Sequence, residues 1–424
     1  MDGCALPRIR SDVPGPRSRA WIARLAEHEC PAITARRERR ARQVHGADPI
    51  VWKEARGANV IDVDGNRFVD LSAAFAVALV GHRNPEILRA VRDQEECLIH
   101  AMGDAFPDET RIRLMEALAR RAPPGLEVCI LGLSGSDAVD AAIKTAYLAT
   151  ARPGVLAFDG AYHGLALGVL PLQAYQPRFS LPFASITHPA VVHLPWGCPL
   201  DMVEKAVEEH NIGLVMIEPI QGRGGIRVPD AGWFQGVARA ARAGGALVCH
   251  DEIQSGLGRT GAWWAGSAME VVPDLLCVGK ALGGGFPLSA CLGTREIMDA
   301  WGPSSGEAIH TQTFLGHPVG CAAGLAVLEW LERRDAPGMA ARVERTIRRR
   351  FSAFRVRGRG AMLALEVPGH AYRMAQGLLR RGYIVLPAGR DDDAIGLTPP
   401  LVITDEQIDA FASAFERVYE EIHP

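Results

Sequence analysis

Short apolar segments alternate with amphipathic segments through the middle of the chain. The apolar segments are expected to be strands, at Val128–Leu133, Val155–Phe158, Leu214–Ile217, Ala246–Cys249 and Leu275–Val278. Because they are apolar at successive positions, they suit a sheet that is buried on both faces and largely parallel. Segments with helical spacing of apolar residues lie between and after them, at Ser136–Thr150, Gly232–Ala243 and Pro318–Glu332. The pattern predicts an α/β fold with a mostly parallel sheet between helices.

The pattern changes after about residue 319. A long helix is followed by a strand at Met362–Glu366, a helix at Tyr372–Arg381, short strands and a final helix, which is typical of a smaller α+β domain. A chain of 424 residues also exceeds what one small core usually holds. We therefore expect an N-terminal segment that contributes to the small domain (1–70), a large domain (71–318) and a C-terminal small domain (319–424).

Composition and charge narrow the classes of function. Apolar residues make up 48% and charged residues 22% of the chain, and the formal net charge is −3; no global field marks nucleic acid or a membrane as a partner. The longest apolar run, Leu71–Val80, is about half the length of a membrane span, and no secretory signal is expected. The arginine-rich stretch Arg36–Arg40 indicates a solvated helix face. Nine cysteines without CxxC spacing suggest reduced thiols in a cytoplasmic protein.

Lysine is scarce, and one lysine differs from the others. The chain has four: Lys53, Lys144, Lys205 and Lys280. The first three have a carboxylate one or four residues away, whereas Lys280 has none within five residues, follows an apolar strand and precedes three glycines. Burial favours the uncharged amine, which is the form that attacks an aldehyde. The alternative is a lysine that extends to the surface or pairs with a distant carboxylate.

Three further features would complete a site for an aldehyde cofactor with a phosphate group. Asp251 follows an apolar strand, where ligands gather in open α/β sheets, although it could simply begin a solvated turn. Ser134-Gly135-Ser136 joins a strand to a helix whose first N–H groups could bind phosphate; Ser134 and Asp137 also match a capping box. Tyr162-His163 offers an aromatic face or an ordinary packed pair. Together these side chains fit pyridoxal phosphate, which needs an acid, a phosphate cradle and a flat surface.

Longer motifs tie these residues together. The most specific are His250–Gly261 (HDEIQSGLGRTG), Pro273-Asp274 and Gly279–Ala290 (GKALGGGFPLSA). In register upstream lie Gly57–Gly65, Gly81–Pro85, Ser134–Ala142, Tyr162–Gly164 and Glu218–Gly222. From about Pro49 onward the chain resembles the class III (ornithine/4-aminobutyrate-type) pyridoxal-phosphate-dependent aminotransferases of fold type I. The resemblance implies a large domain with a mostly parallel sheet and a smaller α+β domain.

The resemblance also implies a role for individual residues. Lys280 would form the Schiff base with pyridoxal 5'-phosphate and act as the base, and Asp251 would pair with the ring nitrogen. The other cofactor-binding residues implied by position are Gly135 and Ser136 at the phosphate, Tyr162 on the ring, Gln254 near the ring hydroxyl, and His163 and Glu218 nearby. Thr313 resembles a threonine that reaches phosphate from the neighbouring subunit, which implies a homodimer with active sites at its interface. No metal is expected.

Two positions depart from the family pattern, and both concern the substrate. Family members that use glutamate carry an arginine just before the Pro-Pro-Leu element, where this chain has Gly396. Many also carry a glutamate at the position of Arg223. We hypothesise that Arg223 or another arginine binds a substrate carboxylate in place of the missing arginine, with Phe75 as a second substrate residue. The alternative is that Arg223 pairs with a local carboxylate.

The resemblance favours an aminotransferase that moves an amino group between an amino acid or amine and an oxo acid. Amino-acid and aminolactam racemases of the same fold resemble the Ser134–Ala138 and Thr398–Leu401 stretches, so a racemase or epimerase remains an alternative. A racemase returns the proton to Cα and needs no acceptor. A degenerate relative that binds a ligand without catalysis is a third reading, although such relatives would lose Lys280 or Asp251 first.

Overall fold

The computed structural model describes residues 3–33, 49–188, 190–304, 306–391 and 393–423, so the predicted helix face at Arg36–Arg40 lies outside the described residues. A seven-stranded sheet forms the centre, in the order β4-β10-β9-β8-β7-β5-β6. Its strands are β4 (Leu126–Gly132), β5 (Gly154–Phe158), β6 (Val191–Leu194), β7 (Ile212–Ile217), β8 (Leu247–Asp251), β9 (Leu275–Val278) and β10 (Ser289–Thr294). The strand β10 runs antiparallel to both β4 and β9, and the other six strands share one direction. The predicted α/β fold is confirmed.

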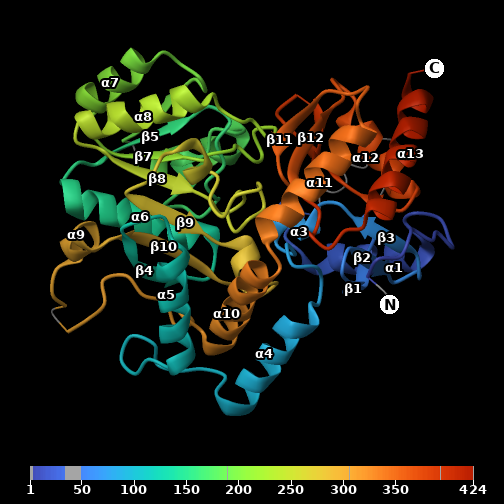
Figure 1. Cartoon of the computed structure of the whole chain (residues 1–424), viewed down its shortest axis with the longest axis horizontal. Coiled ribbons are helices and arrows are strands. Elements are labelled where there is room, and N and C mark those ends of the chain that lie inside the picture. The colour runs from blue at the N-terminus through green and yellow to red at the C-terminus, as the bar shows by residue number, and fades with distance from the viewer. Residues whose placement is uncertain (1–2, 34–48, 189, 305, 392, 424) are drawn as a thin grey trace.

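Helices cover both faces of this sheet (Figure 1). Leu156 and Phe158 of β5 pack with α7 (Leu200–Glu209) and α8 (Ala231–Ala243) on one face. Val155 and Ala157 of the same strand pack with α6 (Gly135–Thr150) on the other. This alternation follows from the two-residue period of a strand. Because both faces are buried, successive residues are apolar, which is why these strands could be recognised in the sequence.

Further helices extend the large unit away from the sheet. The helices α4 (Pro85–Cys97) and α5 (Glu109–Arg121) both contact α10 (Pro318–Arg333), which begins one residue before the predicted C-terminal small domain. Shorter helical segments are α3 (Ala73–Ala76), α9 (Arg295–Met298), η1 (Leu170–Leu172), η2 (Pro177–Phe179), η3 (Leu181–Ile186), η4 (Ser267–Met269), η5 (Lys280–Gly283) and η6 (Asp299–Trp301). No helix in the described ranges is long and apolar enough to cross a membrane.

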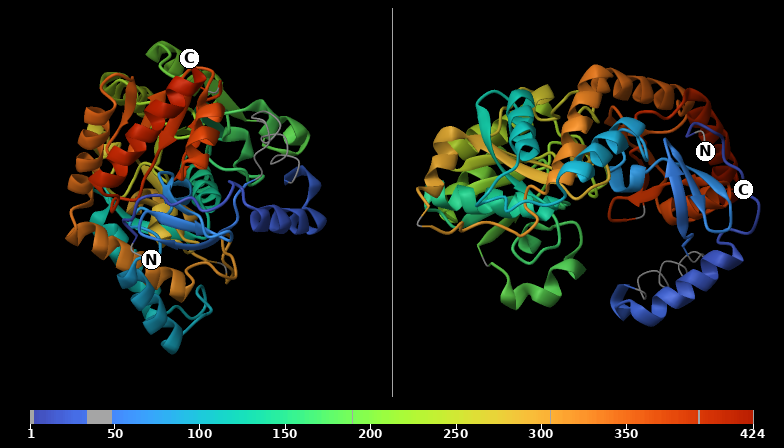
Figure 2. Two further views of the ribbon diagram at one scale, coloured as in Figure 1. Left: turned by 90° about the vertical axis from the view of Figure 1, so that its right-hand side faces the viewer. Right: turned by 90° about the horizontal axis from the view of Figure 1, so that it is seen from below.

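The N-terminal and C-terminal parts of the chain share a second sheet. Strands β1 (Trp52–Arg56), β2 (Asn59–Asp62) and β3 (Arg67–Asp70) form an antiparallel meander, and β13 (Tyr383–Ile384) adds to β3 in parallel. The helix α1 (Pro16–His28) is tied to this sheet because the Asp64 carboxylate accepts hydrogen bonds from the N–H groups of its first turn. Figure 2 shows this N-terminal part beside the C-terminal helices.

A third sheet, in the order β11-β12-β15-β14, lies against the C-terminal helices. Its strands are β11 (Val356–Arg359), β12 (Met362–Glu366), β15 (Ala394–Leu397) and β14 (Leu386–Ala388), and its helices are α11 (Ala336–Arg350), α12 (Ala371–Arg380) and α13 (Asp405–Ile422). One continuous apolar core joins these elements to α5, β4 and α10. The division of the chain into domains at residues 70 and 318 stays a prediction.

Candidate active site

The site is built where parallel strands of the central sheet end. The strand β8 ends at Asp251, β7 ends just before Glu218, and Lys280 comes two residues after β9. Carboxyl ends of parallel strands meet at one edge of a sheet, which is where open α/β proteins bind ligands. A cavity of about 320 Å³ lies here, lined by Phe75, Tyr162, Tyr175, Gly222, Arg223, Ile226, Gln254, Lys280, Leu386, Pro387, Ala388, Gly396 and Thr398.

Lys280 presents its amine to this cavity. Its backbone has a φ of +43°, and its Nζ lies 3.5 Å from Oε1 of Gln254. Burial lowers the pKa of the Lys280 amine, and the negative charges of Asp251 and Glu218 offset that effect only in part. The amine is therefore closer to its uncharged form than a surface lysine, as a nucleophile and a base require. By contrast, Lys144 pairs with Asp140 at 2.9 Å, as its spacing predicted.

A buried chain of acid and imidazole lies behind Lys280. Oδ2 of Asp251 is 2.7 Å from Nδ1 of His163, and its Oδ1 accepts a hydrogen bond from the N–H of Ile253 at 3.1 Å. Burial alone would lower the pKa of His163, but its hydrogen bond to Asp251 and the charges of Asp251 and Glu218 raise it overall. His163 is 2% exposed and does not line the cavity. Its contact is with Asp251, whose carboxylate it orients.

Glu218 joins two loops that form the cavity wall. Its Oε1 accepts a hydrogen bond from the N–H of Tyr162 at 2.9 Å, and its Oε2 accepts one from the N–H of Gly222 at 2.8 Å. Burial raises the pKa of this carboxyl, whereas the neighbouring His163 opposes the rise. Glu218 thereby fixes the positions of Tyr162 and of Arg223, which follows Gly222.

The start of α6 has both the capping box and the free N–H groups that the sequence suggested as alternatives. Ser134 and Asp137 form a capping box, in which the Asp137 side chain accepts from the backbone N–H of Ser134 at 2.9 Å. In the part of the chain that is described, the N–H groups of Gly135 and Ser136 have no acceptor. Free N–H groups at the start of a helix favour an anion. These donors, the amine of Lys280 and the carboxylate of Asp251 together fit pyridoxal phosphate.

Arg223 lies between two tyrosines in the cavity wall. Its guanidinium carbon is 4.8 Å from the ring centroid of Tyr162 and 5.1 Å from that of Tyr175. No carboxylate among the described residues lies within ion-pair distance of Arg223, so the local pairing that was the alternative is not formed. Gly396 also lines the cavity and has no side chain that could bind an anion. Tyr175 was not identified from the sequence, since it lies in a loop without a motif.

Phe75 reaches the cavity from an unusual turn. The helix α3 has φ angles of +44°, +49°, +62° and +68° at its four residues, none of which is glycine. The left-handed conformation costs an L-residue roughly 1–2 kcal/mol, so this turn persists only because its surroundings impose it. Phe75 is 59% exposed and lines the cavity. Strained backbone at a binding wall is typical of a functional position.

Thr313 does not join the cavity of its own chain. It lies exposed in the loop before α10, and it is absent from the cavity wall. The structure therefore brings together Lys280, Gln254, Tyr162, Arg223 and Phe75 in one cavity. Asp251 and Glu218 do not line it but lie close enough to raise the pKa of Lys280 by their charge. Thr398 also lines this cavity. It belongs to the Thr398–Leu401 stretch, but the sequence did not identify it as a site residue.

Comparisons with known proteins give a consistent result. A model of the family "Aminotransferase class-III" matches residues 41–419. The acetylornithine aminotransferase of Methanopyrus kandleri is 34% identical over 85% of this chain and 92% of its own. The alanine/serine racemase of Pyrococcus horikoshii is 32% identical over 98% of this chain and 93% of its own. A pyridoxal-phosphate-bound amine transaminase from an uncultivated Pseudomonas species superposes with a TM-score of 0.81 at 26% identity, over 88% of this chain and 95% of its own.

Proposed function

The chain belongs to the class-III aminotransferase family, and on that premise we propose that Lys280 binds the cofactor and that Arg223 binds a substrate carboxylate. The protein is a pyridoxal-phosphate-dependent aminotransferase. The non-catalytic reading is therefore set aside. The observation that carries the proposal is the amine of Lys280, with its lowered pKa, in the same cavity as an arginine that has no carboxylate partner among the described residues.

The proposed mechanism assigns one task to each residue. When bound, pyridoxal phosphate supplies an electron sink for the electrons of the substrate's Cα–H bond. Lys280 would hold the cofactor through its amine, and the same amine would act as the base that moves the substrate's Cα proton. Asp251 would hold a proton at the ring nitrogen, and His163 orients Asp251 through the 2.7 Å contact between them. The N–H groups of Gly135 and Ser136 would bind the phosphate.

The remaining assignments concern the faces of the cofactor and its edges. Tyr162 would stack on the ring, and its position is held by the hydrogen bond from its N–H to Glu218. Gln254, whose Oε1 is 3.5 Å from the Lys280 amine, would lie near the ring hydroxyl. These roles rest on the shared cavity and on the family motifs that carry the residues.

We propose that the substrate carries one carboxylate and an apolar side chain. Arg223 is the cation that lines the cavity besides Lys280, and a planar guanidinium suits a bidentate carboxylate contact. The rest of the wall is largely apolar, with Phe75, Ile226 and Leu386. A charge at the far end of the substrate would lack a partner among these side chains, which disfavours it.

Replacing Arg223 by methionine should separate carboxylate binding from catalysis. Hydrogen bonds to a charged group contribute about 1.5–3 kcal/mol, so KM for amino acids should rise about 10- to 100-fold. kcat and cofactor affinity should change little, and so should KM for a primary amine without a carboxylate. Arg178→Met, at an exposed arginine stacked on Phe179, is the matched control. An unchanged KM for the amino acid would show that another group binds the carboxylate.

The racemase alternative is supported by one relative and is decided by the fate of the proton. The Pyrococcus horikoshii racemase aligns with nearly the whole chain. Incubation with one enantiomer in deuterium oxide without an oxo acid distinguishes the two reactions. We expect the cofactor spectrum to shift to the amine form while optical activity is retained after one turnover. Deuterium incorporation at Cα with continuous loss of optical activity would instead identify a racemase.

We propose a homodimer with active sites at the interface. Two loops carry exposed apolar side chains, namely Ile99, Met102 and Phe106 at 60–70% exposure and Ile309 and Phe314 at 68% and 52%. The ring of His100 lies 5.3 Å from that of Phe314, so the two loops are adjacent. Thr313 lies beside this apolar patch, where it could reach the phosphate bound by a second copy.

The proposed dimer can be tested by its mass in solution and by a charged substitution in the apolar patch. Sedimentation should give twice the 45.7 kDa of one chain. Phe106→Glu should yield monomers with lower activity, because a charge at a buried apolar contact disfavours association. Retention of full activity by a monomer would exclude shared active sites.

We also propose a cellular location and a set of binding partners for the protein. A reducing, cytoplasmic location is supported by nine cysteines, none of which forms a disulfide. The partners are a small amino donor and an oxo-acid acceptor, without nucleic acid or membrane.

A further inference from the structure

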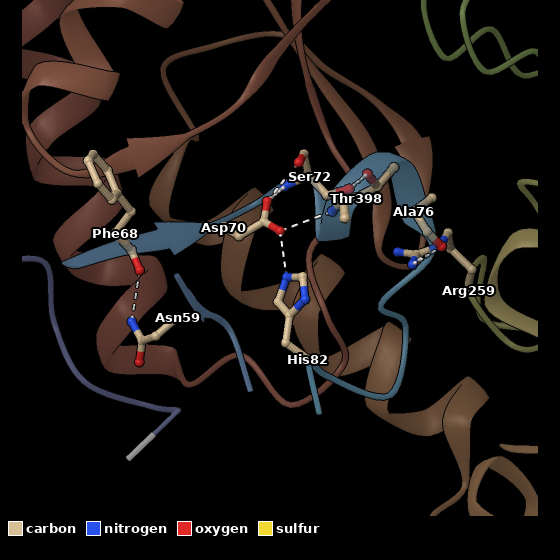
Figure 3. A network of polar contacts seen from close by, with 9 residues as sticks. Asn59, Phe68, Asp70, Ser72, Ala76, His82, Arg259 and Thr398 are labelled. Atoms are coloured by element: carbon tan, nitrogen blue, oxygen red, sulfur yellow. Dashed lines mark hydrogen bonds and ion pairs between the residues drawn. The ribbon is translucent and has the colours of Figure 1, made fainter. Parts of the chain in front are cut away.

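The left-handed turn α3 is held from its N-terminal side by a buried carboxylate (Figure 3). Oδ1 of Asp70 accepts hydrogen bonds from the N–H and the hydroxyl of Ser72 at 2.8 and 2.7 Å. Its Oδ2 accepts from the N–H of Ala74 at 3.0 Å and contacts Nε2 of His82 at 2.8 Å. Asp70 is fully buried, and its two oxygens are engaged four times. This carboxylate fixes how the turn begins.

Arg259 holds the other end of the turn. Its Nη2 donates to the carbonyl of Ala76 at 3.3 Å, and its Nη1 donates to the carbonyls of Pro399 and Ala361 at 3.1 and 3.2 Å. One guanidinium thus joins three segments that are far apart in the sequence. Figure 3 shows Arg259 reaching the carbonyl of Ala76.

Arg259 is a buried cation whose hydrogen-bond acceptors are all backbone carbonyls. It is 1% exposed and is the largest fully buried side chain in the described part of the chain, where no carboxylate lies within ion-pair distance of it. Burial lowers its pKa to about 9, which the charge of Asp70 opposes. A buried charge destabilises the folded state unless hydrogen bonds compensate for its lost hydration, as the bonds to these carbonyls do. Only a planar fork with several donors can bind three carbonyls at once.

Two of the three segments that Arg259 joins form part of the cavity wall. Phe75 lies one residue before Ala76, and Thr398 one residue before Pro399, and both Phe75 and Thr398 line the cavity. The Thr398 hydroxyl also donates to the carbonyl of Ser72 at 2.9 Å. The guanidinium therefore lies behind two wall residues that approach each other from opposite ends of the chain.

We propose that Arg259 is a positioning residue that holds the left-handed turn against the Thr398-Pro399 segment and thereby sets how far Phe75 projects into the substrate cavity. The inference rests on the proposal that substrate occupies this cavity. It assigns substrate selectivity to a residue that touches neither substrate nor cofactor. The turn is strained, so it would relax toward ordinary backbone conformations once the contact to Ala76 is lost.

The test compares Arg259→Lys, Phe75→Ala and the double variant with the wild-type holoenzyme. The probes are alanine and phenylalanine as amino donors, each as the accepted enantiomer, and the measured quantity is the ratio of their kcat/KM values. Arg259→Lys retains the charge but cannot reach three carbonyls, so we expect this ratio to shift by about tenfold through KM. kcat and the cofactor spectrum should stay close to wild type. Arg348→Lys, at an arginine that donates to the carbonyls of Val356 and Gly358, is the control.

The double variant decides whether Arg259 acts through Phe75. Residues that act as a unit are non-additive, so Arg259→Lys should change the ratio no further in the Phe75→Ala background. Additive effects, or an unchanged ratio in Arg259→Lys while Phe75→Ala alters it, would overturn the inference alone. If Phe75→Ala itself leaves the ratio unchanged, the proposed substrate cavity is wrong and the inference falls with it.

Ala74→Gly tests the same idea if Arg259→Lys fails to fold. Glycine adopts positive φ without strain, so Ala74→Gly should raise the unfolding temperature and leave the donor ratio unchanged while Arg259 still holds the turn. Glycine also reaches other backbone conformations, so adding Arg259→Lys in this stabilised background should release the turn and shift the ratio. An equal ratio in Ala74→Gly and in the Ala74→Gly, Arg259→Lys double variant would overturn the inference.

Discussion

Replacing Lys280 by alanine is expected to lower kcat by roughly 10⁴-fold, the upper end of what a positioned base contributes. The variant loses both the amine that binds the cofactor's aldehyde and the base that moves the Cα proton. Lys280→Arg should be equally inactive, because a guanidinium stays protonated and cannot accept a proton. Borohydride treatment followed by mass spectrometry of peptides checks the assignment, since it should fix the cofactor on residue 280 of the wild-type chain and on no residue of either variant.

The pH profile tests the state of the same amine. Burial lowers the pKa of Lys280 below its usual 10.5, so the uncharged fraction at neutral pH exceeds that of a surface lysine. A smaller proton affinity means that kcat should rise with pH and reach its plateau at a lower pH than an unperturbed lysine allows. Lys144→Ala, which removes a surface lysine paired with Asp140, is the control. Turnover by Lys280→Ala at near the wild-type rate would refute the assignment of Lys280.

Asp251→Asn is expected to lower kcat by about 100-fold or more, because an amide cannot hold a proton at the ring nitrogen as a carboxylate does. The ring then withdraws electrons from Cα less strongly, and proton removal slows. Asp274→Asn is the matched control, since Asp274 accepts a hydrogen bond from Val248 at the opposite end of the same strands. Its substitution should alter thermal stability more than kcat.

His163→Gln separates orientation from charge at Asp251. The N–H of Ile253 still holds one oxygen of the carboxylate, so the loss in kcat should be smaller than that of Asp251→Asn. The two rates, measured under saturating cofactor and substrate, decide the point. Equal losses in the two variants would mean that His163 does more than orient Asp251.

The parts of the fold that could be predicted are those whose pattern is local. Strands β5, β7 and β9 are buried on both faces, so their apolar runs were visible in the sequence. The strand β10 was missed because its residues, Ser-Ala-Cys-Leu-Gly-Thr, are small and of mixed polarity, although it is paired on both edges. Strand order depends on long crossovers that no local pattern encodes.

The same distinction holds for the site. Lys280 and Asp251 could be identified because each follows a recognisable strand within a motif. The contact of His163 with Asp251 spans 88 residues, and that of Arg259 with Ala76 spans 183, so neither could be read from neighbouring residues. The run Leu71–Val80 contains no glycine, and nothing in it indicates the left-handed turn that tertiary contacts impose on Ala73–Ala76.

The parallel pairing of β13 with β3 means that the N-terminal sheet cannot be completed until late in the synthesis of the chain. The edge of β3 that Tyr383 and Ile384 cover is complete only after some 300 further residues have left the ribosome, which takes roughly 15–60 s at ordinary rates of synthesis. During that interval an unpaired strand edge is available to other nascent chains. A chain that stops short of Tyr383 would keep the central sheet and most of the cofactor residues, yet it would expose this edge permanently and depend on chaperones to stay in solution.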